Sequence, residues 1–102
     1  MRVVAKRSLQ AFWERPGCRD ARGPLESWHE EALRSNWTSP HSVKAHFATA
    51  SMVGRNRVVF DVGGNKYRLV VEMQYRAGIA RVKFVGTHAE YDRINVETVN
   101  DD

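Results

Sequence analysis

Four residues in the second half of the chain combine side chains that can cleave RNA. Lys66 and Arg68 lie in one predicted strand, and His88 and Tyr91 follow the next one. With a turn centred on Ala77, antiparallel pairing places His88 close to Lys66. The spacing therefore brings Lys66, Arg68 and His88 to one end of a hairpin.

RNA cleavage by these residues needs no metal. A ribose 2′-hydroxyl attacks the adjacent phosphorus, and the departing 5′-oxygen must receive a proton. A histidine such as His88 exchanges protons near cell pH, and the guanidinium of Arg68 can grip the phosphate as negative charge builds up. Lys66 adds positive charge, and Tyr91 can donate a hydrogen bond or stack on a base.

The third predicted strand contributes further cations. Strict alternation puts Arg81 and Lys83 on one face and Val82 and Phe84 on the other. We expect the cationic face to be the open side of the sheet, where it can contact RNA.

Charge also favours a polyanionic partner. The formal net charge is +4 and the isoelectric point is near 9.6, and clustered cations gain affinity by releasing counterions from phosphates. Lys44 and Arg55, beside a predicted loop, are either solvated charges or contacts to the RNA backbone.

Length and composition predict one folded domain over residues 1–102. The chain is 42% hydrophobic and 27% charged, which is ordinary for a globular protein. Cys18 is the only cysteine, so no internal disulfide can form, and no histidine shares a metal-ligand spacing with it. No stretch is apolar enough to span a membrane or to serve as a signal peptide. We expect a soluble, cytoplasmic protein with no cofactor.

Apolar periodicity predicts helices in the first half of the chain. The expected elements are a strand over residues 2–5, a helix ending at Pro16-Gly17, a helix from about Gly23 to Asn36, a turn capped by Ser39-Pro40, and a loop over residues 48–56.

Within the second helix, Leu25, Trp28, Ala32 and Leu33 should share the buried face. Trp13 and Trp28 are expected in the core, whereas Trp37 is equally consistent with core and surface. His29, His41 and His46 are expected at the surface.

The second half alternates like an antiparallel sheet. We predict strands over residues 57–62, 66–75 and 79–85, with a hairpin turn at Gly63-Gly64-Asn65 and a last helix over about residues 89–95. Alternation puts Tyr67 and Leu69 on the core face and Arg68 on the other. The fold class is thus α+β, with helices on one face of a meander and the other face open.

Two segments closely resemble the HigB family of RelE-like toxins. They are Arg57-Val58-Val59-Phe60-Asp61-Val62-Gly63-Gly64-Asn65-Lys66-Tyr67-Arg68-Leu69-Val70-Val71 and Phe84-Val85-Gly86-Thr87-His88-Ala89-Glu90-Tyr91-Asp92. The opening residues 2–7 and Phe12-Trp13-Glu14 are similar to the same family, so the resemblance covers nearly the whole chain.

The resemblance implies the toxin of a type II toxin-antitoxin module, an endoribonuclease that cuts messenger RNA during translation on the ribosome. It also implies a cognate antitoxin with a helix-turn-helix domain, through which DNA is contacted only indirectly. RelE-like enzymes place an arginine at the position of Arg68 and a cationic or proton-donating residue near His88. Tyr91 comes earlier than the late tyrosine of some relatives.

Two other functions fit the same residues. One is a non-catalytic RNA- or ribosome-binding module on the same fold, which shares the charge and the sheet surface. The other is a decayed toxin that retains only its partner interface. Formation of cleaved RNA distinguishes an enzyme from the binding module. Growth arrest without antitoxin distinguishes an active toxin from a decayed one.

Overall fold

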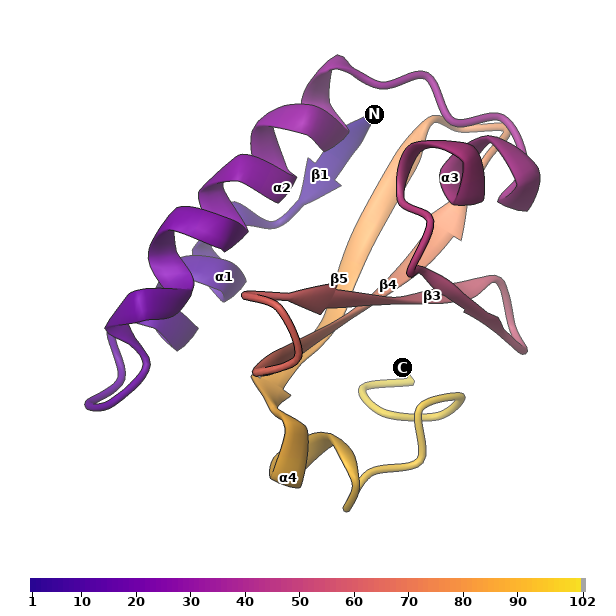
Figure 1. Ribbon diagram of the computed structural model, residues 1–102. Helices are drawn as coiled ribbons and strands as arrows, with labels where there is room; N and C mark the ends of the chain where they lie inside the picture. The colour runs from indigo at the N-terminus through magenta and orange to yellow at the C-terminus, as the bar shows by residue number, and fades with distance from the viewer. Residues whose placement is uncertain (102) are drawn as a thin grey trace.

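A five-stranded sheet carries helices on one of its faces and a short helix with an irregular segment on the other (Figure 1). The computed structural model describes residues 1–101. The elements are β1 (Arg2–Val4), α1 (Lys6–Trp13), a 3₁₀ helix η1 (Arg19–Ala21), α2 (Arg22–Arg34), α3 (Pro40–His46), β2 (Ser51–Val53), β3 (Arg57–Val62), β4 (Tyr67–Gln74), β5 (Ile79–Thr87) and α4 (His88–Tyr91). The α+β class is confirmed.

The strand order is β1-β5-β4-β3-β2. Strands β2 to β5 form an antiparallel meander, whereas β1 pairs in parallel with β5, with Arg2 opposite Ile79. The first strand of the chain therefore completes the sheet beside the last strand.

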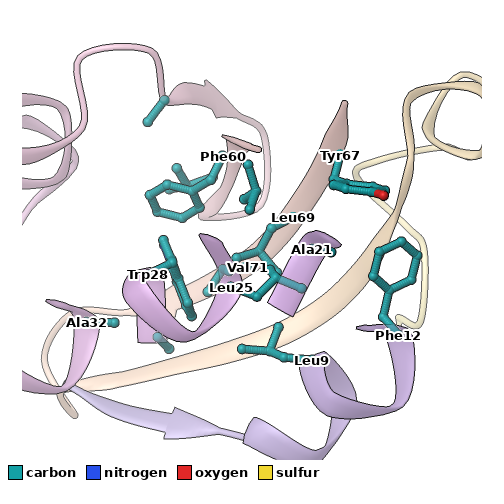
Figure 2. Close-up of a cluster of buried hydrophobic side chains, with 14 of the residues drawn as sticks. Leu9, Phe12, Ala21, Leu25, Trp28, Ala32, Phe60, Tyr67, Leu69 and Val71 are labelled. Carbon is teal, nitrogen blue, oxygen red and sulfur yellow. The ribbon is translucent and has the colours of Figure 1, made fainter. Parts of the chain in front are cut away.

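The core lies between the helices and one sheet face. Leu9 of α1 and Leu25 of α2 pack toward Leu69 and Val71 of β4, and all four are fully buried (Figure 2). Trp13 and Trp28 are core residues as predicted, and Trp37 is also buried. Full burial of each large apolar side chain stabilises the fold by roughly 1.5–3 kcal/mol.

The predicted buried face of α2 is partly wrong. Leu33 is 50% exposed, and His29, expected at the surface, is 9% exposed. Leu25, Trp28, His29 and Ala32 follow the i, i+3, i+4, i+7 spacing of one helix face, and Leu33 lies at the edge of that stripe. Burial lowers the pKa of His29, because it disfavours the charged imidazole.

Two other predicted boundaries also differ. The predicted loop over residues 48–56 contains strand β2, which pairs with β3 at the sheet edge. A three-residue strand is too short to show alternation. The last helix ends at Tyr91 rather than near Asn95, and turns follow it.

A β-bulge in β5 overturns the predicted strand faces. Phe84 pairs with Val70 and Val82 pairs with Val71, so Val82 and Phe84 lie on opposite faces. The extra residue is Lys83, which sits between them. As a result, Val82 packs against the core, and Phe84 shares the second face with Arg81.

This second face is not open, contrary to the sequence prediction. Val59 and Val70 lie on it, yet they are 4% and 0% exposed. Arg57, on the same face, donates from Nη1 to the carbonyl oxygens of Val96 at 2.9 Å and Val99 at 2.8 Å. Residues 93–101, hereafter the 93–101 segment, therefore run across this face, as the yellow end of the chain shows (Figure 1).

Candidate active site

Backbone register brings the predicted hairpin residues together. Arg68 lies opposite Gly86, and the His88 amide donates to the Lys66 carbonyl oxygen at 3.2 Å. The predicted proximity of His88 to Lys66 is therefore confirmed. These residues form a rim where β4 begins and β5 ends.

His88 is held at the start of α4 by a capping box. The Thr87 hydroxyl accepts from the Glu90 amide, and the Glu90 carboxylate accepts from the Thr87 amide. The His88 side chain is 48% exposed, with Nδ1 lying 3.1 Å from Asp92 Oδ2. A carboxylate at Nδ1 fixes the ring and leaves Nε2 for proton exchange.

Arg15 connects this helix to the end of α1. Its guanidinium contacts both Glu90 oxygens, at 3.3 and 3.1 Å, and lies 5.0 Å from the Phe12 ring centroid. Hydrogen bonds from the Thr87 amide and from Arg15 lower the pKa of Glu90. Arg15 and Glu90 were not predicted as site residues, because they are distant in sequence and only the fold joins them.

Asp20 organises the other side of the rim. Its carboxylate accepts hydrogen bonds from the Lys66 ammonium and the Tyr67 hydroxyl. These bonds lower the pKa of Asp20, and they raise the pKa values of Lys66 and Tyr67. Tyr67 itself is buried and packs edge-on against Phe12 at 5.4 Å. Sequence reasoning missed Asp20, which carries no local motif.

The sequence predicts Arg68 on an open sheet face, but in the structure Arg68 is buried. It is 8% exposed, and its Nε lies 3.2 Å from Asp61 Oδ1. Its terminal nitrogens donate to the Asn65 side chain at 2.7 Å and to the carbonyl oxygens of Asn65 and Tyr67. These contacts hold the guanidinium inside the turn that precedes β4.

Tyr91, the last residue of α4, is partly buried. It follows His88 by three residues, and residues at this spacing are neighbours on one helix surface. The structure therefore brings Tyr91 to the same rim as His88.

The predicted RNA-binding residues do not form one cluster. Lys44 donates to the Ala50 carbonyl oxygen at 2.6 Å beside α3. Arg55, in the turn between β2 and β3, and Lys83 instead contact the 93–101 segment, and Arg81 lies on the second sheet face. Arg55 pairs with Asp101 at 2.8 Å, Lys83 contacts the Asn100 carbonyl oxygen at 3.2 Å, and Arg81 lies opposite Glu72.

A hollow of about 480 Å³ lies at the α1–α2 junction. Trp13, Glu14, Arg19 and Arg22 line it, and none of the predicted catalytic residues does. We therefore place the candidate chemistry at the hairpin rim, where the backbones of His88 and Lys66 pair. Over residues 1–101, no group of three or more His, Cys, Asp or Glu side chains is placed to hold a metal ion. In the same part of the chain, none of the helices has the length and apolar character to cross a membrane.

Comparison with known families places this fold and rim in a class. A family model described as HigB toxin, the RelE-like toxic component of a toxin-antitoxin system, matches residues 21–94. The match spans the rim, whereas residues 2–14 and 95–101 lie outside it. No curated protein matches the chain significantly.

The class is thus that of toxins from toxin-antitoxin systems. The chain belongs to the HigB toxin family.

Proposed function

We propose that this toxin is an endoribonuclease that cuts messenger RNA during translation on the ribosome, without a metal ion. The observation that carries the proposal is the meeting of His88 and Lys66 at one rim, joined through the His88 amide and the Lys66 carbonyl. Family membership supports it, because RelE-like toxins are generally ribonucleases.

The reaction begins when a ribose 2′-hydroxyl attacks the neighbouring phosphorus. The 2′-hydroxyl releases its proton to water, the bond to the 5′-oxygen of the next nucleotide breaks, and protonated His88 supplies a proton to that oxygen. The products are a 2′,3′-cyclic phosphate and a 5′-hydroxyl. Lys66 stabilises the negative charge on the phosphate oxygens, while Asp92 orients the imidazole.

Arg68 and Tyr91 have supporting roles in this proposal. Arg68 contributes positive charge from beneath the rim and positions the turn that carries Lys66, because its donors are bound to Asp61, Asn65 and Tyr67. Tyr91 donates a hydrogen bond to the RNA or stacks on a base next to the cleaved bond.

The proposal also covers the partner protein and the cellular location. We propose that a cognate helix-turn-helix antitoxin neutralises the toxin, contacts DNA on behalf of the complex, and acts with it in the cytoplasm. The family supports an antitoxin partner. Lys44, Arg55, Arg81 and Lys83 remain the proposed contacts to the RNA backbone.

Cleavage assays with ribosomes and messenger RNA test the enzyme. We expect His88→Ala to lower the cleavage rate by about 10²- to 10⁴-fold with an unchanged melting curve, because a proton-transfer group is lost from an exposed position. His41→Ala removes an exposed histidine from α3 and serves as the control.

Two results would contradict the proposal. Parent-rate cleavage by His88→Ala would reject histidine as the proton donor. Binding of RNA or ribosomes with no new RNA ends would favour the non-catalytic binding module instead.

A further inference from the structure

Arg57 is a buried cation with incomplete hydrogen bonding. Its side chain is 1% exposed, and within residues 1–101 neither Nε nor Nη2 has a hydrogen-bond partner. Nη2 has only long contacts, at 3.9 Å each, to Glu72 and Asp101. Burying a charge without full pairing is costly, so the covering segment holds Arg57 in an unfavourable environment.

The 93–101 segment also occupies two neighbouring cations. Asp101 forms an ion pair with Arg55 at 2.8 Å. Asn100 binds Lys83 twice, since its carbonyl oxygen accepts from the ammonium at 3.2 Å and its side-chain amide donates to the Lys83 carbonyl at 2.5 Å. The segment is thus fastened to this face mainly through polar contacts with cations.

The sheet face beneath the segment has a surplus of positive charge. Its cations are Arg55, Arg57, Arg68, Arg81 and Lys83, and its carboxylates are Asp61 and Glu72. The segment supplies one carboxylate and several carbonyl oxygens to them. A chain of phosphates offers the same kind of acceptor with a full charge on each group.

We propose that the sheet face beneath the 93–101 segment is a second RNA-binding surface, which the segment occupies in competition with the RNA backbone. The proposal rests on the proposed function and extends it to how RNA is held. Phosphates accept from guanidinium groups in a bidentate manner, so RNA would supply the acceptors that Arg57 lacks.

The position of this surface favours RNA over a peptide. Arg68 lies on the same face, opposite Gly86, and joins Arg57 and Arg81 to the rim of Lys66 and His88. An RNA strand cut at the rim can therefore continue along the row of cations. The present segment brings a single carboxylate, Asp101, to these cations and gives Lys83 only a carbonyl oxygen, whereas every phosphate of an RNA strand carries a full negative charge.

RNA binding, measured without cleavage, tests the inference. The probe is a fluorescent 20-nucleotide RNA with 2′-O-methyl groups, which lacks the attacking hydroxyl. We expect deletion of residues 93–102 to tighten binding about tenfold and to steepen the dependence of log K on log salt by about 1.4, the value for two more phosphates on a single strand. Adding Arg57→Gln to the deletion should remove about half of that extra slope.

A point variant covers the case in which the deletion variant does not fold. Asp101→Asn frees Arg55 and Arg57 of their shared carboxylate and should tighten binding at least twofold. Glu97→Gln, the matched control, removes the same charge from a carboxylate that lies against Gly54, and should leave binding nearly unchanged. Equal effects of the two variants would overturn the inference.

Other outcomes separate this inference from the proposed function. A folded deletion variant with parent affinity and slope would overturn it, as would a variant that gains affinity only for the antitoxin. If the deletion variant binds RNA more tightly than the parent but the parent does not cleave RNA, the proposed enzyme fails and the binding surface stands. If the parent cleaves RNA and the deletion variant binds RNA with the parent's affinity, only the binding surface fails.

Discussion

The guanidinium of Arg68 has a structural role in addition to the role proposed for it in catalysis. It binds Asp61 near the end of β3 and Asn65 in the turn between β3 and β4, directly before Lys66. An arginine bound in this way fixes the backbone of the residues that we propose approach RNA. Its loss should therefore affect stability as well as catalysis.

Arg68→Ala is expected to lower the free energy of unfolding by about 2 kcal/mol, because Asp61, Asn65 and the Tyr67 carbonyl oxygen lose the buried guanidinium that they bind. Urea unfolding measures this change. Arg76→Ala, at an exposed turn, is the control and should cost less than about 0.5 kcal/mol. Unchanged stability of Arg68→Ala would mean that its donors are free for phosphate.

Asp20 should make stability depend on acid pH. Its folded pKa lies below the ordinary value of 3.8, because Lys66 and Tyr67 donate to the carboxylate. The unfolded chain thus binds the proton first, so this stability is fully present above pH 3.8 and disappears as the pH falls through the lower folded pKa.

Acid titration of the parent and of Asp20→Asn tests this linkage. The variant should show a shallower loss of stability below pH 3.8, since the amide does not titrate. Parallel curves for the two proteins would remove Asp20 from the acid response. Glu14→Gln, an exposed carboxylate at the end of α1, is a suitable control.

At the level of elements, helix α4 has only four residues and depends on its contacts. Glu90 both caps the helix and pairs with Arg15. These two contributions can be separated, because glutamine keeps a capping box and loses the ion pair.

Glu90→Gln should therefore change stability by only a few tenths of a kcal/mol, as expected for a half-exposed ion pair. Glu90→Ala should cost about 1 kcal/mol, because the Thr87 amide loses its side-chain acceptor in the capping box as well. Thermal melting gives both values, and cleavage should fall more in the alanine variant because His88 begins this helix. Equal losses in the two variants would show that the ion pair, rather than the cap, holds α4.

The predictability of the elements depended on their length and on local signals. Alternation and Gly63-Gly64-Asn65 were enough to predict β3 and β4, and with them the proximity of His88 to Lys66. The bulge at Lys83 escaped prediction because strict alternation allows no extra residue. The covering of the second face also escaped, since it depends on Arg57 binding carbonyl groups far along the chain.

Some rim residues could likewise be predicted from the sequence and others could not. His88 and Lys66 lie on paired strands, so register alone was enough to bring them together. Asp20 and Arg15 reach the rim from the α1–α2 connection through tertiary packing, which no short spacing encodes.

At the level of the whole molecule, net charge of +4 should govern RNA affinity. Binding of the 2′-O-methyl RNA should weaken steeply as salt rises, because counterions compete for phosphates. Lys83→Glu should reduce the slope by about 0.7 or more if its ammonium contacts RNA. Binding that is equal at low and high salt would contradict this expectation.

A second whole-molecule prediction concerns the partner. We expect the neighbouring gene to encode a helix-turn-helix protein, and induced expression of the toxin without it to arrest growth. The His88→Ala variant should relieve the arrest and still bind the antitoxin. Continued growth with the folded parent protein would favour a decayed toxin.

The parallel pairing of β1 with β5 has a consequence for the timing of synthesis. Strand β1 leaves the ribosome before β5, and its partner residues, such as Ile79 opposite Arg2, emerge on the order of several seconds later. Such a distant contact also makes folding slow relative to that of helical proteins. Ribosome-bound chains arrested before residue 79 should therefore be protease-sensitive. The His88 amide and the Lys66 carbonyl, which pair at the rim, also come together only in this late step. If the rim is the site of cleavage, as proposed, the toxin becomes active only then.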